Sequence, residues 1–317
     1  MKKRRLPGTD IDLSVVGFGC WAMGKTYWGD DVDDDTSRAA VREALNCGIN
    51  WFDTAPLYGE GHADTVLVSA LGPDKHHVHI ATKVGVRFGG EGEHASSDLS
   101  PSWIIEDTEA SLQRLGIEQI GLLQVHWPCE SGTDLRASLD TLEALRDAGK
   151  IRYYGLCNYD AAAVQMASEY PGMVSLQTPY SLLRREFEAS LRPACDQKPV
   201  GVLAYEPLCR GLLTGKFKTF PRFPESDMRA WDERFQGDRF LHARALVADL
   251  ERVGKKVGLP TSAVAIGWVL GQPGITAAIV GAKRPSQVCQ NVQGARLADR
   301  PSVVRIIDKV AAIHGGS

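Results

Sequence analysis

Eight short apolar runs with strand character alternate with helix-like segments along this chain of 317 residues. Strands that alternate with helices at such a spacing form right-handed parallel units. Eight units of this kind close into a (β/α)8 TIM barrel, whose functional loops follow the carboxyl ends of the strands. The eight runs are Val15–Gly19, Asn50–Asp53, His79–Val84, Ile120–His126, Arg152–Leu156, Ser175–Thr178, Gly201–Tyr205 and Ala277–Val280.

The segments between these runs carry helical patterns. The clearest, Asp134–Ala148, places Leu135, Leu139, Leu142 and Leu145 on one stripe and ends before a glycine, as an amphipathic helix does. An open, doubly wound sheet is the competing α/β architecture, and it is disfavoured because no Gly-x-Gly-x-x-Gly turn opens the first helix. The other expected helices are Thr36–Cys47, Ala63–Ala70, Pro101–Leu115, Ala161–Glu169 and Glu186–Asp196.

Two segments fall outside the repeat. Lys3–Leu6 and Ile11–Ser14 flank the turn Pro-Gly-Thr-Asp, which predicts an N-terminal hairpin that plugs the barrel. Lys216–Phe240 is rich in charge, aromatic residues and proline without a clean period. A loop of that length in a compact domain is usually a lid or a binding loop. With no linker in sight, we expect residues 1–317 to form a single domain with long loops at its carboxyl-terminal face.

Composition excludes several classes of protein. A hydrophobic content of 44% and a charged content of 24% are typical of a globular protein with a sizeable core. The net charge of -3 gives no support for a nucleic-acid partner, and no apolar run approaches the length of a membrane span. The seven cysteines are scattered without paired spacing, which favours free thiols and a cytoplasmic location. No apolar segment follows the basic start, so we expect no signal peptide.

Four residues stand where a barrel would place its chemistry. Asp53, Lys83 and His126 each close an apolar run, and Tyr58 lies in the loop after Asp53. A carboxylate, a phenol, an amine and an imidazole at one rim suit proton transfer beside a partly buried ion pair. Each residue alone is more often structural, but the four in this order favour function. The histidine spacings predict no metal site.

The motifs around these residues resemble the aldo-keto reductase family, from about Leu6 to Asn291. They are Gly48–Ala55 followed by Tyr58-Gly59, then Ala81-Thr82-Lys83, then Gln124–Pro128. The resemblance implies the same eight-stranded barrel and an NADPH cofactor bound without a Rossmann fingerprint. It also implies that Tyr58 is the general acid, that Asp53 and Lys83 tune it, and that His126 orients a carbonyl group. A phenol of pKa about 10 is a poor acid at neutral pH, and we expect the Lys83 ammonium to lower that pKa.

The same resemblance implies a set of cofactor contacts. It implies that Asn158 and Gln177 bind the amide of the nicotinamide and that Tyr205 stacks on the nicotinamide ring. Two positions depart from the family pattern, because Cys157 and Glu206 stand where serine is common. The structural alternative for the basic segment near residue 283 is that it only begins a helix on a solvent-exposed face. The loop beside the diphosphate is expected to contain Pro207, Leu208, Arg210 and Gly211, and the 2′-phosphate and adenine segment Gly281, Lys283, Arg284, Gln287 and Asn291.

Aromatic residues predict the substrate side. Trp28 and Trp127 would line an apolar pocket for aldehydes and ketones of little charge, so the expected partner is a small carbonyl compound. Trp231, Phe235 and Phe240 either add a wall or simply pack. The leading hypothesis is an NADPH-dependent carbonyl reductase, and the alternative is an NADPH-binding regulatory barrel with slow turnover. A hydrolase or isomerase without a nicotinamide is disfavoured by the cofactor motifs.

Overall fold

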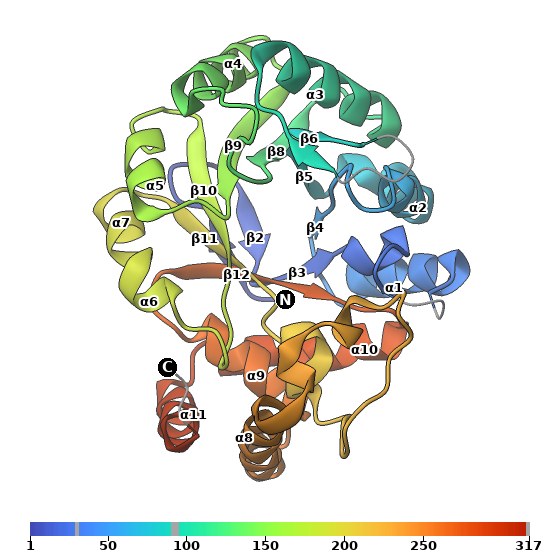
Figure 1. Ribbon diagram of the computed structural model, residues 1–317, viewed down its shortest axis with the longest axis vertical. Helices are drawn as coiled ribbons and strands as arrows, with labels where there is room; N and C mark the ends of the chain where they lie inside the picture. The colour runs from blue at the N-terminus through green and yellow to red at the C-terminus, as the bar shows by residue number, and fades with distance from the viewer. Residues whose placement is uncertain (29–31, 90–94, 315–317) are drawn as a thin grey trace.

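The computed structural model describes residues 1–28, 32–89 and 95–314, and its centre is a closed barrel of eight parallel strands (Figure 1). The strands are β3 (Val16–Gly19), β4 (Trp51–Asp53), β5 (His79–Val84), β8 (Ile120–Val125), β9 (Ile151–Cys157), β10 (Met173–Pro179), β11 (Gly201–Tyr205) and β12 (Ile275–Gly281). They follow one another around the barrel in chain order, and β12 pairs with β3 to close it. The predicted barrel and all eight predicted strands are confirmed, and the open sheet is wrong.

Helices surround the barrel (Figure 1). They are α1 (Asp34–Asn46), α2 (His62–Leu71), α3 (Pro101–Leu115), α4 (Leu135–Asp147), α5 (Ala161–Ala167), α6 (Phe187–Ser190), α7 (Arg192–Gln197), α8 (Gly237–Val257), α9 (Thr261–Leu270), α10 (Pro285–Asn291) and α11 (Pro301–Ile313). Local chemistry sets their ends. Asp33 caps α1 by accepting a hydrogen bond from the Thr36 amide, and Gly116 stops α3 with a left-handed φ of 60°.

One predicted helix is interrupted. The segment Glu186–Asp196 forms two short helices, α6 and α7, with Leu191 between them at a φ of -114°. Pro193 lies in the first turn of α7, where its missing N–H costs nothing, whereas inside one continuous helix its ring would clash with the preceding turn. The proline therefore divides the predicted helix in two.

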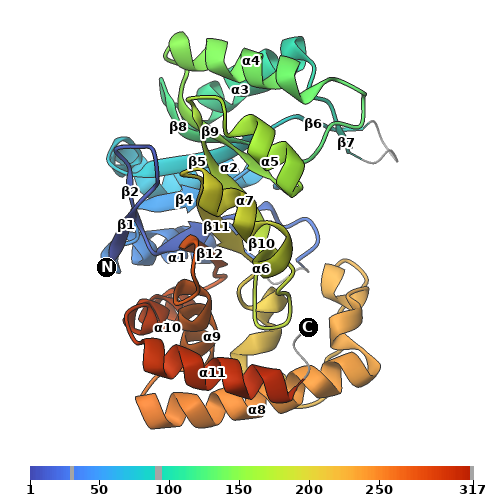
Figure 2. The ribbon, with the colours of Figure 1, turned by 90° about the vertical axis from the view of Figure 1, so that its left-hand side faces the viewer.

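The N-terminal hairpin closes one end of the barrel. Its strands, β1 (Lys3–Arg5) and β2 (Asp12–Ser14), are antiparallel. Leu6 is fully buried, and a Cβ placed on Gly201, the first residue of β11, would meet the Leu6 side chain at 2.4 Å. The plug therefore lies at the amino ends of the strands. Figure 2 shows the hairpin at one end and the ribbon of β6 (Val86–Arg87) and β7 (Ser96–Ser97) at the other.

Candidate active site

The four residues singled out in the sequence meet at the carboxyl ends of the strands. Asp53 is the last residue of β4, Lys83 is the penultimate residue of β5, and His126 follows β8 directly. Tyr58 lies in the loop between β4 and α2. Its backbone carbonyl accepts a hydrogen bond from the amide of Ala63, the second residue of α2. The barrel topology thus gathers side chains that are far apart in the sequence.

A close approach of two loops holds Tyr58 in place. Gly59 has a φ of 65°, and a Cβ there would meet the carbonyl oxygen of Gly24 at 2.4 Å. Only glycine fits both the left-handed backbone and this contact. The Tyr58–Gly59 pair is therefore a steric requirement of the loop as well as a sequence motif.

Lys83 joins the other charged groups. Its Nζ donates hydrogen bonds to Asp53 Oδ1 at 2.7 Å, to the Thr54 carbonyl at 3.0 Å and to the Tyr58 hydroxyl at 3.1 Å. Lys83 is 1% exposed and Asp53 3%. Charges so deeply buried are stable only when they are paired and hydrogen-bonded. The second oxygen of Asp53 accepts from the Gln177 side-chain amide at 2.7 Å.

Burial changes the expected electrostatics of this group. Burial alone would lower the pKa of Lys83, but the negative partners around it, Asp53 first among them, together outweigh burial and raise that pKa above its usual value. Burial raises the pKa of the Tyr58 phenol, and Lys83 offsets only part of the rise. The expectation that Lys83 makes Tyr58 more acidic is right for the sign of its contribution and wrong for the net direction. Tyr58 keeps its proton at neutral pH and can donate it.

His126 is neutral in this setting. Burial, and then the Lys83 charge, hold the pKa of His126 well below its usual value. Its ring stacks on Trp127 with centroids 4.2 Å apart and meets the Tyr58 ring edge-on at 6.2 Å. Among the described atoms, His126 Nδ1 is buried without a hydrogen-bond partner. A neutral imidazole beside a protonated phenol provides two donors for one oxygen atom.

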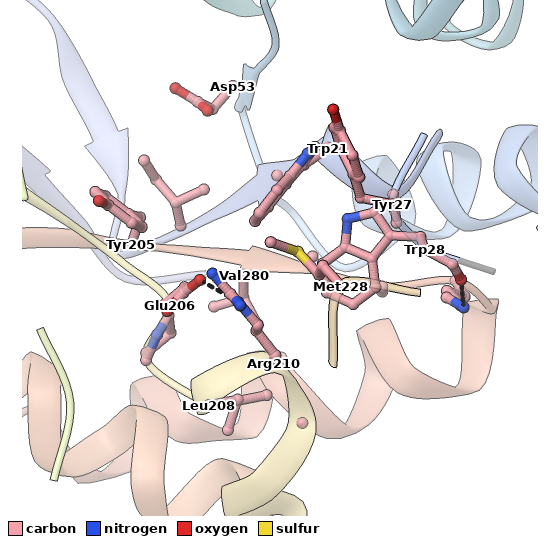
Figure 3. A pocket seen from close by; sticks show the side chains of 18 of the residues that line it. Trp21, Tyr27, Trp28, Asp53, Tyr205, Glu206, Leu208, Arg210, Met228 and Val280 are labelled. Carbon is pink, nitrogen blue, oxygen red and sulfur yellow. Dashed lines mark hydrogen bonds and ion pairs between the residues drawn. The ribbon is translucent and has the colours of Figure 1, made fainter. Parts of the chain in front are cut away.

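These groups open into a cavity of about 900 Å³, near the upper end of small-molecule sites. Figure 3 shows the rings of Trp21 and Trp28 on one side and the ion pair of Glu206 and Arg210 on another. Every residue predicted for the site lines this cavity except two. Lys83 lies behind the wall, and Arg284 is exposed outside the lining. Arg284 therefore stays a predicted cofactor contact, at an exposed position next in the chain to the lining residue Lys283.

At the inner end of the cavity, the predicted amide-binding residues contact one another. Asn158 donates to the His126 carbonyl at 3.2 Å and accepts from the Tyr205 hydroxyl at 2.7 Å. The Gln177 amide oxygen accepts from the Cys157 thiol at 3.5 Å. The side chain of Gln177 therefore bridges Asp53 and Cys157, and the thiol takes a hydrogen-bonding role at a position where serine was expected.

Arg210, expected to offer a cation to a diphosphate, is already paired. It contacts Glu206 at 2.8 Å and Asp232 at 3.0 Å. Arg234 completes the network with Glu206 at 3.2 Å and Asp232 at 2.6 Å. Two arginines and two carboxylates leave this cluster formally neutral. A diphosphate here would have to share Arg210 with its present partners.

Sequence reasoning missed Asp232 and Arg234, although a repeated pattern points to them. Asp227-Met228-Arg229 and Asp232-Glu233-Arg234 are two Asp-x-Arg triplets within the long loop. In each, the aspartate accepts from both the backbone amide and the guanidinium of the arginine two residues later. Each triplet is thus a self-contained turn that presents a fixed ion pair.

The basic segment before α10 is organised by Gln287. Its side-chain oxygen accepts from the backbone amides of Lys283 at 2.7 Å and Arg284 at 3.2 Å. Lys283 Nζ donates to the carbonyl of Trp28 at 2.9 Å, and Lys283 and Asn291 both line the cavity. Gln287 therefore shapes the turn, and Lys283 brings a positive charge to the cavity wall.

A chain of aromatic rings leads from the cavity mouth to the tetrad of Asp53, Tyr58, Lys83 and His126. Trp28 meets Trp21 edge-on at 5.4 Å, and Trp21 stacks near Tyr58 at 6.2 Å. With Trp127 beyond His126, these rings give the substrate side the predicted aromatic wall.

The long loop contributes to the wall through one of its three predicted aromatics. Trp231 lines the cavity and is 59% exposed. Phe235 and Phe240 are 3% and 1% exposed and serve as packing. Phe235 contacts Phe217 and Phe223, and Phe240 contacts Phe220. The buried rings join the loop to the main hydrophobic core of the domain.

The cavity can be tested for its fit to a nicotinamide dinucleotide. Its lining is continuous from Tyr58 through Tyr205 and the 206–211 loop to Lys283 and Asn291. A Cβ on Gly281, which lines the cavity, would meet the Gly19 carbonyl at 3.5 Å, an ordinary van der Waals contact. The length of the cavity, the aromatic ring of Tyr205 and the positive charge of Lys283 at the far end fit such a ligand.

Comparisons with known proteins point to one family. The Aldo/keto reductase family profile matches residues 15–312. Aldo-keto reductase YhdN of Bacillus subtilis is 34% identical, over 91% of this chain and 87% of its own length. The NADH-specific methylglyoxal reductase of Escherichia coli is 33% identical, over 92% and 93%. The glycerol dehydrogenase AKR11B4 of Gluconobacter oxydans superposes with a TM-score of 0.89 at 35% identity, over 99% of this chain and 96% of its own.

Within the described residues, no helix combines the length and the apolar character that crossing a membrane requires.

The fold, the tetrad at the barrel rim and the relatives all lead to one assignment. The chain belongs to the aldo/keto reductase family, whose members are nicotinamide-dependent oxidoreductases that act on carbonyl compounds.

Proposed function

We propose that this protein reduces aldehydes and ketones to alcohols with NADPH, and that Tyr58 is the proton donor. One observation carries the proposal. The hydrogen-bonded series Asp53–Lys83–Tyr58 ends at a phenol that opens into the cavity beside neutral His126. The Tyr58 phenol holds a proton at neutral pH, and the charge of Lys83 beside it favours release of that proton to an alkoxide.

The chain's own residues account for the proton chemistry. Bound NADPH supplies the hydride that reduces the carbonyl carbon. His126, as a neutral N–H donor, polarises and orients the carbonyl oxygen. Tyr58 transfers its proton to that oxygen as negative charge develops there. The phenolate that results is stabilised by Lys83, which lies 3.1 Å from the Tyr58 oxygen, and Asp53 keeps Lys83 charged.

The cofactor would lie along the lining of the cavity. Asn158 and Gln177 suit the nicotinamide amide, Tyr205 its ring, and the backbone of residues 207–211 the diphosphate. We propose NADPH over NADH because Lys283 lies on the wall and Arg284 is next to it in the chain. Two cations suit a dianionic 2′-phosphate. The Escherichia coli relative is named as NADH-specific, so cofactor preference needs its own measurement.

The substrate proposed is a small carbonyl compound of little charge, because aromatic rings make up much of the wall near the tetrad. Methylglyoxal and dihydroxyacetone belong in the first panel, since two relatives are named for related three-carbon compounds. Benzaldehyde and larger aryl aldehydes test the aromatic wall.

Steady-state oxidation of NADPH and of NADH, each with this panel, tests the proposal. We expect sustained turnover with NADPH and its loss in Tyr58→Phe. Cofactor binding with a single turnover and no steady state would support the regulatory barrel with slow turnover instead.

We also propose that residues 1–317 act as one domain in the cytoplasm, with the seven free cysteines as support for a reducing compartment.

A further inference from the structure

Three potential metal ligands converge on the outside of the barrel, where α1 packs against α10. They are Glu43 in α1, Cys47 at the end of α1, and Cys289 in α10. Their ligand atoms all lie within 4.8 Å of one another, and within the described residues this is the one group of at least three His, Cys, Asp or Glu side chains that converge so closely. None of the three lines the cofactor cavity.

The two thiols share one acceptor. Cys289 donates to Glu43 Oε1 at 3.0 Å, and Cys47 donates to the same oxygen at 3.6 Å. The other Glu43 oxygen accepts from the Asn46 amide at 3.3 Å, which fixes the carboxylate. Cys289 is exposed and Cys47 half-buried. Two sulfur atoms and one oxygen thus point at a common place that solvent can reach.

The carboxylate of Glu43 acts on both thiols of this cluster. Burial, Cys289 and Glu43 raise the pKa of Cys47 to about 12. The hydrogen bond to Glu43, together with burial, raises the pKa of Cys289. Such thiols are poor redox sensors, because the thiolate is the reactive form. A divalent cation reverses the effect of these neighbours, since it deprotonates the thiols that it binds and is attracted by the carboxylate.

We propose that Glu43, Cys47 and Cys289 form a binding site for a borderline-soft divalent cation, with Zn²⁺ as the best fit. Thiolate ligands select Zn²⁺ over Mg²⁺ and Ca²⁺, which prefer oxygen. Three protein ligands leave a fourth tetrahedral position to water. Binding forms two metal–sulfur bonds and one metal–oxygen bond to Glu43, displaces water from the hydrated ion, and releases two thiol protons to solvent, with no change in oxidation state.

The site would join two helices with different roles. α1 is an outer helix of the barrel, whereas Gln287, Gln290 and Asn291 of α10 line the cofactor cavity. A bound ion would cross-link α1 to the helix that forms this wall. The site is structural in character, and it does not depend on the proposed catalytic role of Tyr58.

Cobalt provides a direct probe. The full chain, stripped with a chelator and kept in a phosphine reductant, is titrated with Co²⁺. We expect one ion per chain, with thiolate-to-cobalt charge-transfer absorption and the visible bands of a tetrahedral site, both abolished by Zn²⁺. Cys47→Ser, Cys289→Ser and Glu43→Gln should each weaken Zn²⁺ binding at least by the roughly 10–100-fold that loss of an outer ligand contact costs.

Cys129→Ser is the matched control, because Cys129 is the other thiol that is neither fully buried nor part of the cluster. Its Co²⁺ spectrum and Zn²⁺ affinity should equal those of the unaltered protein. Zn²⁺ should raise the Tm of this control but not that of Cys289→Ser, because an ion that binds only the folded state stabilises it. Far-UV circular dichroism checks that each variant is folded.

A second measurement needs no variant. Zn²⁺ should protect Cys47 and Cys289 of the unaltered protein from alkylation by iodoacetamide, as read by peptide mass spectrometry, while Cys129 stays reactive. A Co²⁺ spectrum without a charge-transfer band, or Zn²⁺ binding that Cys289→Ser leaves unchanged, would overturn the proposal. At a pH at which iodoacetamide alkylates Cys289 in the absence of Zn²⁺, equal alkylation of Cys289 with and without Zn²⁺ would do the same.

Discussion

Gln177 donates a 2.7 Å hydrogen bond to the oxygen of Asp53 that does not contact Lys83. The residue expected to bind the cofactor amide therefore also contacts Asp53, which pairs with Lys83 behind Tyr58. A cofactor that engages Gln177 would alter the environment of Asp53 through one side chain. If both proposed roles hold, the hydrogen bond from Gln177 would couple cofactor binding to proton donation.

Removing the phenolic hydroxyl tests the proton donor. Tyr58→Phe should lower kcat by about 10²–10⁴-fold, the usual contribution of general acid catalysis. NADPH affinity should stay nearly the same, because the ring is retained. Fluorescence titration of NADPH and steady-state rates measure the two quantities. Turnover close to that of the unaltered protein would mean that another group donates the proton.

Replacing the buried lysine should damage both activity and stability. Lys83→Met leaves Asp53 as a buried carboxylate with its cation removed, and breaking such a pair costs about 3–5 kcal/mol in free energy of unfolding. The double variant Asp53→Asn/Lys83→Met should regain much of that stability without regaining activity. Urea unfolding and kcat measured on the same samples separate the effects. A single variant as stable as its parent would contradict the pairing.

The neutral His126 predicts a pH dependence of stability. Because its folded pKa is depressed, the unfolded chain takes up this proton first as pH falls below about 6.5. The contribution to stability is present above that pH and is lost on acidification, by at most about 1.4 kcal/mol per pH unit. Urea unfolding between pH 7 and pH 5 should show a smaller loss in His126→Gln.

The titration of Asp107 changes stability in the opposite direction to that of His126, so Asp107 is retained in both proteins that are compared. Burial raises its pKa to about 6, so the folded state takes up that proton first, and acidification through this range adds stability. The difference between the parent and His126→Gln cancels this contribution. Identical pH slopes in the two proteins would show that His126 does not titrate as proposed.

Cofactor preference should depend on the basic segment before α10. Neutralising Lys283 and Arg284 together should weaken NADPH binding by about 2–4 kcal/mol, from the loss of one or two charged contacts, and leave NADH nearly unchanged. Arg284→Gln alone is the milder probe, because its side chain is exposed. Dissociation constants for both cofactors decide the matter. An equal loss for both would place the 2′-phosphate elsewhere.

The aromatic wall predicts a difference between two tryptophans. Trp28→Ala should raise KM for bulky aryl aldehydes more than for small ones, since lost apolar contact scales with area at about 25 cal/mol per Å². Trp127→Ala should also lower kcat, because Trp127 stacks on His126. NADPH affinity should hardly change in either variant. A uniform rise in KM for small and large aldehydes would argue against this wall.

The barrel could be predicted because each strand is a compact apolar run. The closure of the barrel follows from the eight repeated strand–helix units. Tyr58, Lys83 and Asp53 were likewise marked by local motifs. The pairing of Arg210 with Asp232 could not be predicted, since it depends on how a long loop folds back. The grouping of Cys47 with Cys289 depends on helix packing across 241 intervening residues. Burial, which reverses the net pKa shift of Tyr58, likewise becomes visible only in three dimensions.

The anchoring of the long loop has a consequence for how substrate range could change. Phe217, Phe223 and Phe235 pack on one another and tie the loop to the main core, whereas Trp231 lines the cavity and is 59% exposed. The side chains that hold the loop are therefore separate from the aromatic side chain that it presents to the cavity. If a ligand contacts Trp231, substitutions there would change specificity at little cost in stability, so new substrates would be accessible by single steps in evolution or in engineering.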